Sequence, residues 1–64
     1  MKTWLTCDGY GEVYRHTKYE DGYESEPEHI GNIELADDGY RWFQMYGDNR
    51  TLNVAELRQI LDFI

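Results

Sequence analysis

Three residues supply all the thiol and imidazole groups in this 64-residue chain, namely Cys7, His16 and His29. Any thiol catalysis or transition-metal binding would depend on them. Cys7 alternates with Leu5, which is typical of a small buried hydrophobic residue and not of an activated thiolate. Two histidines without a third ligand at close spacing do not define a zinc site. The sequence therefore predicts no catalytic residue, no metal, no cofactor and no enzymatic activity.

Two acidic turns, Glu20-Asp21-Gly22 and Asp37-Asp38-Gly39, offer hard oxygen ligands of the kind that calcium prefers. Neither has the alternating acids and distal Glu of an EF-hand loop, so we expect at most a weak cation site. Paired carboxylates also act in glycosidases, but that reaction needs an enclosing cleft that raises the pKa of one carboxyl group. A chain of this length forms a single small domain, 1–64, which is too small for such a cleft.

The acidic residues are unevenly distributed along the chain. Thirteen acids face six basic residues, which gives a formal net charge of −7. Ten of the acids lie between Asp8 and Asp38, where Arg15 and Lys18 are the only bases. Such a field repels phosphate backbones and anionic lipid, and it accelerates encounter with a basic protein surface. We therefore expect no direct binding to nucleic acid or membrane, and a basic protein surface as the partner.

Aromatic residues are interleaved with these acids, and that combination suits a surface that docks on Arg and Lys. A solvated hairpin tip that only keeps the protein soluble is the alternative interpretation. The predicted partner-binding residues are the carboxylates and the two neighbouring tyrosines: Glu20, Asp21, Glu24, Glu26, Glu28, Asp37, Asp38, Tyr19 and Tyr23.

Turn signals define the elements that must position these residues. The triplet Asp-Gly-Tyr occurs at 8–10, 21–23 and 38–40, and Asp-Gly favours two-residue type I′ hairpin turns. Three turns imply a four-stranded meander, with strands predicted at about 2–7, 12–19, 30–35 and 40–46. Gly31 is a candidate bulge, and Gly47-Asp48-Asn49 should end the last strand. Residues 24–29 should form an edge segment or loop, because Pro27 cannot donate a ladder hydrogen bond.

The C-terminal segment predicts a helix over about 54–64. Asn53 is a favoured N-cap, Glu56 completes a variant of the capping box, and Leu52 and Leu57 form a hydrophobic staple. We expect the helix to pack through an apolar face made of Val54, Leu57, Ile60, Leu61 and Ile64. The sheet face that receives it should carry Leu5, Cys7, Ile33, Leu35, Phe43 and Met45. The expected class is α+β, an antiparallel four-stranded meander packed on one C-terminal helix.

The opposite sheet face should carry Trp4, Tyr40, Trp42 and Tyr46. Exposed aromatics of this kind mark a protein interface, or they cover one another by cross-strand pairing. A single cysteine cannot form an intrachain disulfide, and no apolar run approaches the roughly 18 residues of a membrane span. A run of acids and turns that begins at Asp8 leaves no apolar stretch for a signal peptide. These features predict a cytoplasmic protein.

In general character the chain resembles the small acidic inhibitors that bacteriophages encode against host defence, including anti-CRISPR proteins and other DNA mimics. The features that carry the resemblance are the length, the charge of −7, the lack of catalytic motifs and the acidic segments Glu20-Asp21, 24–28 and Asp37-Asp38. The resemblance implies a monomer or homodimer that occupies a basic nucleic-acid-binding surface of a host complex and blocks it without chemistry. The alternative is a small structural module that self-associates through the aromatic sheet face.

Overall fold

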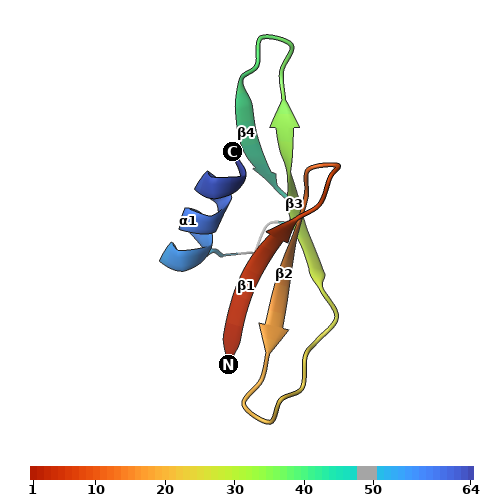
Figure 1. Ribbon diagram of the computed structural model, residues 1–64, viewed down its shortest axis with the longest axis vertical. Helices are drawn as coiled ribbons and strands as arrows, with labels where there is room; N and C mark the ends of the chain where they lie inside the picture. The colour runs from red at the N-terminus through yellow and green to blue at the C-terminus, as the bar shows by residue number, and fades with distance from the viewer. Residues whose placement is uncertain (48–50) are drawn as a thin grey trace.

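The computed structural model describes residues 1–47 and 51–64. These residues form four strands and one helix: β1 (Lys2–Cys7), β2 (Glu12–Lys18), β3 (Glu28–Leu35), β4 (Arg41–Met45) and α1 (Val54–Phe63). Neighbouring strands pair antiparallel in the order β1-β2-β3-β4, and α1 lies beside the curled sheet (Figure 1). The predicted α+β class, with a four-stranded meander and a C-terminal helix, is confirmed.

The molecule is elongated, measuring 46 by 22 by 21 Å. The β2–β3 connection lies at one end of the long axis and the β3–β4 turn at the other (Figure 1). Strand bounds differ from the predictions by one or two residues at the ends of β2, β3 and β4. The largest difference is the start of β3 at Glu28, because Glu28 and His29 already pair with Arg15 and Tyr14. Asp48 and Asn49, which we expected to end the last strand, lie outside the described residues.

The hairpin turns are three-residue loops, so the prediction of two-residue type I′ turns is wrong. In the second hairpin, Tyr19 N donates to Tyr23 O at 2.8 Å and Gly22 N donates to Tyr19 O at 3.0 Å. The third hairpin repeats both bonds between the corresponding backbone groups of residues 36–40. A type I′ turn also needs positive φ at its Asp, and no described residue other than glycine has positive φ. The loops are instead type I turns followed by a glycine in the left-handed conformation, which forms a G1 bulge.

The first hairpin uses its Asp-Gly-Tyr triplet in a different place. Asp8 itself closes the loop, since Asp8 N donates to Glu12 O at 3.0 Å. The left-handed position is occupied by Gly11, with φ of 83°, and not by Gly9. All three triplets nevertheless share one bond, in which the Asp Oδ1 accepts the N–H of the Tyr two residues on at 2.9 Å. The triplet is therefore a local hydrogen-bonding unit that occurs at two different positions of the same loop type.

A β-bulge lies next to Gly31. Val13 pairs with Gly31 and Tyr14 pairs with His29, which leaves Ile30 as the extra residue on β3. Ile30 is fully buried in the core. Gly31 is required for close packing, because a Cβ there would lie 2.3 Å from Gln44 O on β4. The bulge shifts the pleat so that Ile30 enters the core while His29 stays on the face opposite the helix.

The core is centred on Leu5, Val13, Ile30 and Ile60. Half-buried side chains pack around it, and they are Cys7, Ile33, Phe43, Leu52 and Phe63. The prediction that Leu35 belongs to this face of the core is wrong, because its side chain is 62% exposed. Leu35 pairs with Arg41 next to the β3–β4 turn, where the hairpin extends beyond the end of α1 (Figure 1). Apolar burial therefore ends before the tip of this hairpin.

Helix α1 presents a different face to the sheet from the one predicted. Of the expected apolar face only Ile60 is buried, and Glu56 is the other buried residue of the helix. Four apolar side chains remain exposed: Val54, Leu57, Leu61 and Ile64. The predicted N-terminus is confirmed, since Asn53 Oδ1 accepts Glu56 N at 2.8 Å and Glu56 Oε1 accepts Asn53 N at 3.0 Å. The reason for the rotation is polar pairing between the helix and strands β1 and β2.

Two polar contacts set this rotation. Gln59 Oε1 accepts the backbone N–H of Leu5 at 2.7 Å, which satisfies an outward-facing donor on the edge strand β1. Arg15 on β2 donates from Nε to Glu56 Oε2 at 2.7 Å. Arg15 Nη2 also donates to the carbonyl of Thr51, just before the helix. These contacts bring Glu56, Gln59 and Ile60 toward the sheet and turn the other four residues of the predicted apolar face toward solvent.

Candidate functional site

The β2–β3 hairpin brings tyrosines and carboxylates together at one end of the molecule. The rings of Tyr19 and Tyr23 stack with centroids 5.9 Å apart and an interplanar angle of 26°. Both rings are exposed, Tyr23 by 63%. Glu20 and Asp21 occupy the loop between them, and both are exposed. We call this group, together with Glu24, the acidic tip.

The fold of the loop explains why the tip has this shape. Backbone bonds close the loop at Tyr19 and Tyr23, so both tyrosines are fixed at the base of the same turn. The carboxylate of Asp21 is partly used in this turn, because its Oδ1 accepts Tyr23 N. Glu20 remains directed outward, and its nearest charged partner is the N-terminal amine at 3.7 Å. The tip therefore combines a stacked aromatic pair with exposed negative charge.

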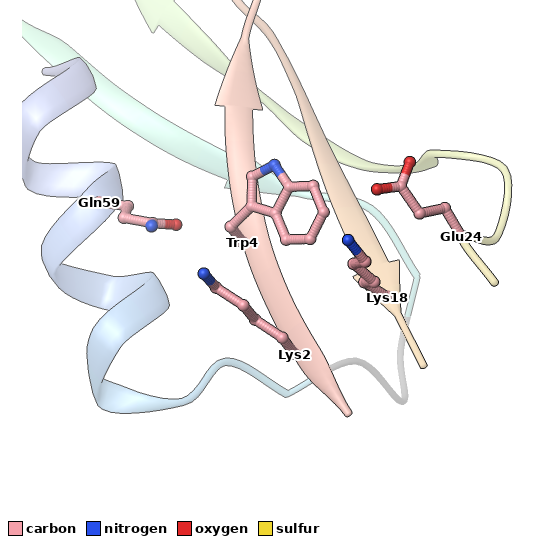
Figure 2. Close-up of a pocket in the computed structure, with 5 residues that line it drawn as sticks. All are labelled: Lys2, Trp4, Lys18, Glu24 and Gln59. Atoms are coloured by element: carbon pink, nitrogen blue, oxygen red, sulfur yellow. The ribbon is translucent and has the colours of Figure 1, made fainter. Parts of the chain in front are cut away.

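Glu24 lies on the side of the tip that faces a shallow groove. The groove has a volume of about 430 Å³ and is lined by Lys2, Trp4, Lys18, Glu24 and Gln59, as Figure 2 shows. Lys2 and Lys18 are direct cross-strand partners, and Lys18 forms an isolated backbone bridge with Glu24. The two ammonium groups offset part of the negative charge on this side. The tip is therefore more acidic at Glu20 and Asp21 than along the groove.

Residues 24–28 follow β2 more closely than predicted. Ser25 N donates to Thr17 O at 3.0 Å, which extends the pairing beyond the bridge at Glu24. Glu26 is exposed between this bond and the start of β3. Glu28 is also exposed, and it pairs in register with Arg15, the residue that holds Glu56. Glu28 thus lies beside a structural ion pair, whereas Glu26 lies in the exposed segment between Ser25 and the start of β3.

Asp37 and Asp38 lie at the other end of the molecule. Both are exposed in the β3–β4 turn, and Asp38 Oδ1 accepts Tyr40 N. The rings of Tyr40 and Trp42 stack behind this turn, with centroids 5.6 Å apart. The long axis of 46 Å separates the two turns (Figure 1). The nine predicted partner-binding residues are therefore all on the surface, but they form two groups and not one continuous face.

The sheet face opposite α1 carries a row of aromatic and imidazole rings. Trp4 stacks on His16 with centroids 5.3 Å apart and an interplanar angle of 9°. His29 packs between Tyr14 and Tyr46, with centroid distances of 5.1 and 4.9 Å. The expected outward direction of these aromatics is confirmed, and much of the ring surface is covered by cross-strand pairing.

The two histidines of this face have separate partners. His16 Nε2 lies 2.7 Å from Thr6 Oγ1, and His29 Nε2 contacts the carboxylate of Glu12. The strand register places Trp4 opposite His16 and Tyr14 opposite His29. Among residues 1–47 and 51–64, no group of three or more His, Cys, Asp or Glu side chains could hold a metal ion. Both imidazoles act in the packing of this face.

Two groups near Glu12 have shifted pKa values. Partial burial, Asp8 and Glu12 raise the pKa of the Cys7 thiol, and Cys7 Sγ donates to Asp8 O at 3.6 Å. Burial and the carboxylates of Glu12 and Glu34 raise the pKa of the Tyr46 hydroxyl. A raised thiol pKa lowers the fraction of nucleophilic thiolate at neutral pH. Cys7 is therefore less reactive than a free cysteine.

Sequence reasoning missed the ion pair between Arg15 and Glu56. A signal was present, since Arg15 alternates with Val13 and Thr17 and must share the face of the buried Val13. A cation on an inward face needs an acidic partner or backbone carbonyls. The helix pattern placed Glu56 on a polar side, so the partner was not identified. Because Glu56 is buried in this ion pair, its carboxylate is not available to a binding surface.

Comparison with protein-family models, with curated proteins and with solved structures found no match. Within the described part of the chain, no helix is both long and apolar enough to cross a membrane.

Proposed function

We propose that this chain is a non-enzymatic binding protein that docks its acidic tip on a basic, nucleic-acid-binding surface of a cytoplasmic partner protein and blocks that surface. Phage-encoded inhibitors of the anti-CRISPR type act in this way. The observation that carries the proposal is the stacked, exposed pair of Tyr19 and Tyr23 with Glu20 and Asp21 in the loop between them.

This combination matches the chemistry of arginine and lysine side chains. A guanidinium group pairs with a carboxylate through two parallel hydrogen bonds and stacks on an aromatic ring. Tyrosines already fixed in a loop lose little conformational entropy on binding. The closing bonds fix the backbone at Tyr19 and Tyr23, and the two rings stack on each other. The acidic tip therefore offers both an anchor and a charged rim to a basic partner.

The charge of the whole molecule supports docking at a local surface more than mimicry of a complete duplex. Seven net negative charges along 46 Å correspond to about one charge per 7 Å, against one per roughly 1.7 Å of duplex axis. The field is nevertheless sufficient to steer encounter with a basic surface. Blocking then follows because the tip occupies the position of a phosphate backbone.

Capture from a bacterial lysate on the immobilised chain, at low and at high salt, tests the proposal. The tip variant reverses three charges (Glu20→Lys, Asp21→Lys, Glu24→Lys), and the matched control reverses three at other positions (Glu26→Lys, Asp37→Lys, Asp38→Lys). We expect the wild-type chain and the control to retain, at low salt, a nucleic-acid-binding protein that the tip variant loses. The captured protein should release a labelled oligonucleotide when the wild-type chain is added. Equal capture by both variants, or capture without displacement, contradicts the proposal.

Self-association through the aromatic sheet face is the second candidate function. It is supported by Tyr40 and Trp42, which stack on each other and remain 65% and 36% exposed. If this face assembles the protein, Trp42→Lys should convert a concentration-dependent oligomer into a monomer in sedimentation experiments. If the Trp42→Lys variant self-associates as strongly as the wild-type chain, this candidate is ruled out.

A further inference from the structure

Helix α1 exposes an apolar stripe on the side turned away from the sheet. Its four members are 64%, 49%, 71% and 42% exposed, and they are Val54, Leu57, Leu61 and Ile64. Their spacing of three, four and three residues is the a/d pattern of helices that pair with another helix. Gln59, which contacts β1, lies nearly opposite Leu57 and Leu61 around the helix. The stripe is therefore separate from the groove beside the acidic tip.

The stripe is symmetric about residue 59, and this property selects its partner. Val54 and Ile64 lie equally far from Gln59, and so do Leu57 and Leu61. In an antiparallel pair of identical helices with a twofold axis near Gln59, Val54 therefore faces Ile64 of the second copy. Leu57 likewise faces Leu61 of the second copy. A twofold interface requires this self-complementarity, in which residue i contacts j and j contacts i.

The charges beside the stripe fit the same arrangement. Arg58 and Asp62 are exposed and lie one turn apart on one flank of the stripe. Antiparallel pairing brings Arg58 of one copy beside Asp62 of the other, with an offset along the helix axis of less than about one helical turn. The twofold axis then generates a second, identical ion pair. A parallel pair places identical residues level with each other and gives no such complementarity.

Two copies of the chain, each with a net charge of −7, can approach each other through their helices with little electrostatic repulsion. Residues 51–64 carry Glu56, Arg58 and Asp62, and Glu56 is already paired with Arg15. The charge on the exposed part of the helix is thus close to zero. Both acidic turns lie at the ends of the sheet, away from the middle of α1 (Figure 1). Electrostatic repulsion between copies is therefore smaller for this approach than for one through the hairpins.

From these observations we infer that the chain forms a twofold-symmetric homodimer through antiparallel pairing of α1 along Val54, Leu57, Leu61 and Ile64. Three partly exposed side chains on a helix of ten residues, together with that of its C-cap Ile64, provide on the order of a few hundred Å² per copy. This area is below that of a standard interface, so the dissociation constant should lie on the order of 10–100 µM. The dimer leaves both acidic tips accessible, and it does not depend on the proposed docking function.

Sedimentation equilibrium of the whole chain from about 10 µM to about 1 mM tests the inference. We expect the average mass to rise from 7.7 kDa toward twice that value. Leu61→Glu should raise the dissociation constant at least tenfold. The matched control is Tyr10→Glu, a still more exposed aromatic position in the first turn (92% against 71% for Leu61), which should leave the constant unchanged. Circular dichroism of each variant should report an unchanged fold, because every substituted side chain is exposed.

A charge exchange tests the antiparallel arrangement. Arg58→Asp and Asp62→Arg should each weaken the dimer several-fold, and the double variant should restore the wild-type constant, since the ion pair forms again in reverse. Added salt should leave the dimer intact or strengthen it, whereas docking of the acidic tip should weaken. A chain that stays monomeric to about 1 mM, or a Leu61→Glu variant that dimerises like the wild type, overturns the inference. Absence of rescue by the double variant overturns the antiparallel arrangement.

Discussion

Arg15 and Glu56 form an ion pair that joins the middle of the sheet to the first turn of the helix, with Arg15 Nε 2.7 Å from Glu56 Oε2. The side chain of Glu56 is 4% exposed and that of Arg15 is 17% exposed. Glu56 also accepts the N–H of Asn53 in the capping box. The same carboxylate therefore caps the start of the helix and fixes its rotation on the sheet.

Removal of the cation should strongly destabilise the protein. In Arg15→Met the carboxylate of Glu56 stays buried without a cationic partner, and the free energy of unfolding should fall by about 3 kcal/mol or more. In the double variant Arg15→Met, Glu56→Gln, the neutral amide keeps the capping bond and should recover at least half of the loss. Urea denaturation measures both, with the exposed Arg58→Met as control. A loss below about 0.5 kcal/mol would show that the pair is not a structural contact.

The two glycines of the first turn should respond very differently to alanine. Gly11 has φ of 83°, and a Cβ there would lie 2.8 Å from Ile33 O, whereas a Cβ at Gly9 meets nothing within 4 Å. Gly11→Ala should lower the free energy of unfolding by about 1–3 kcal/mol, and Gly9→Ala should change it by less than about 0.5 kcal/mol. Thermal unfolding followed by circular dichroism compares them. Greater sensitivity at Gly9 would indicate a two-residue loop in place of the observed one.

The three aspartates of the triplets should contribute unequally. Asp8 Oδ1 accepts the N–H groups of both Tyr10 and Glu12, at 2.9 and 3.0 Å, while Asp21 and Asp38 each accept one. Alanine removes these bonds and asparagine keeps an acceptor, so the difference between the two variants isolates the bonds from the change in charge. We expect a difference of about 1–2 kcal/mol at Asp8 and roughly half of that at the other two. Equal differences at all three positions would contradict the second bond.

Stability should decrease in alkaline solution through Cys7. Burial, Asp8 and Glu12 raise the pKa of its thiol above 9.0, so the folded chain keeps a proton that the unfolded chain releases. The contribution is fully present below the unfolded pKa and is lost as pH rises through the folded pKa. Urea midpoints measured on either side of pH 9 should fall less in Cys7→Ser than in the wild type. The rate of alkylation by iodoacetamide should reach half its maximum above pH 9.0, and Asp8→Asn should lower that midpoint.

Local signals accounted for the class and order of the elements. Asp-Gly pairs between alternating strands identified three hairpins, and Asn53 with Glu56 identified the start of the helix. These predictions succeeded because a turn or a cap depends on residues a few positions apart. The prediction of the turn type was wrong for a related reason. An Asp-Gly pair fits both a type I′ turn and the end of a type I turn with a G1 bulge, and closure by Tyr19 and Tyr23 decided between them.

The candidate sites were only partly predictable. The two tyrosines that flank Glu20 and Asp21 were identified as an anchor, because they are neighbours along the chain. The sequence analysis grouped these residues with Asp37 and Asp38, although the β2–β3 and β3–β4 turns are successive turns of a meander and therefore lie at opposite ends of the sheet. The apolar stripe of the helix was predicted to face the core, because periodicity identifies an apolar face without indicating what covers it.

By itself, the sequence determined that this protein is a small acidic meander with one C-terminal helix, because strand alternation, turn residues and helix caps act over short distances along the chain. Only the tertiary structure decided which side of the helix is buried. Arg15 and Glu56 are far apart in sequence, and the cost of leaving either charge buried alone exceeds the gain from burying one more leucine. Their pairing rotates the helix, exposes Leu57 and Leu61, and leaves the molecule with an apolar surface as well as an acidic one.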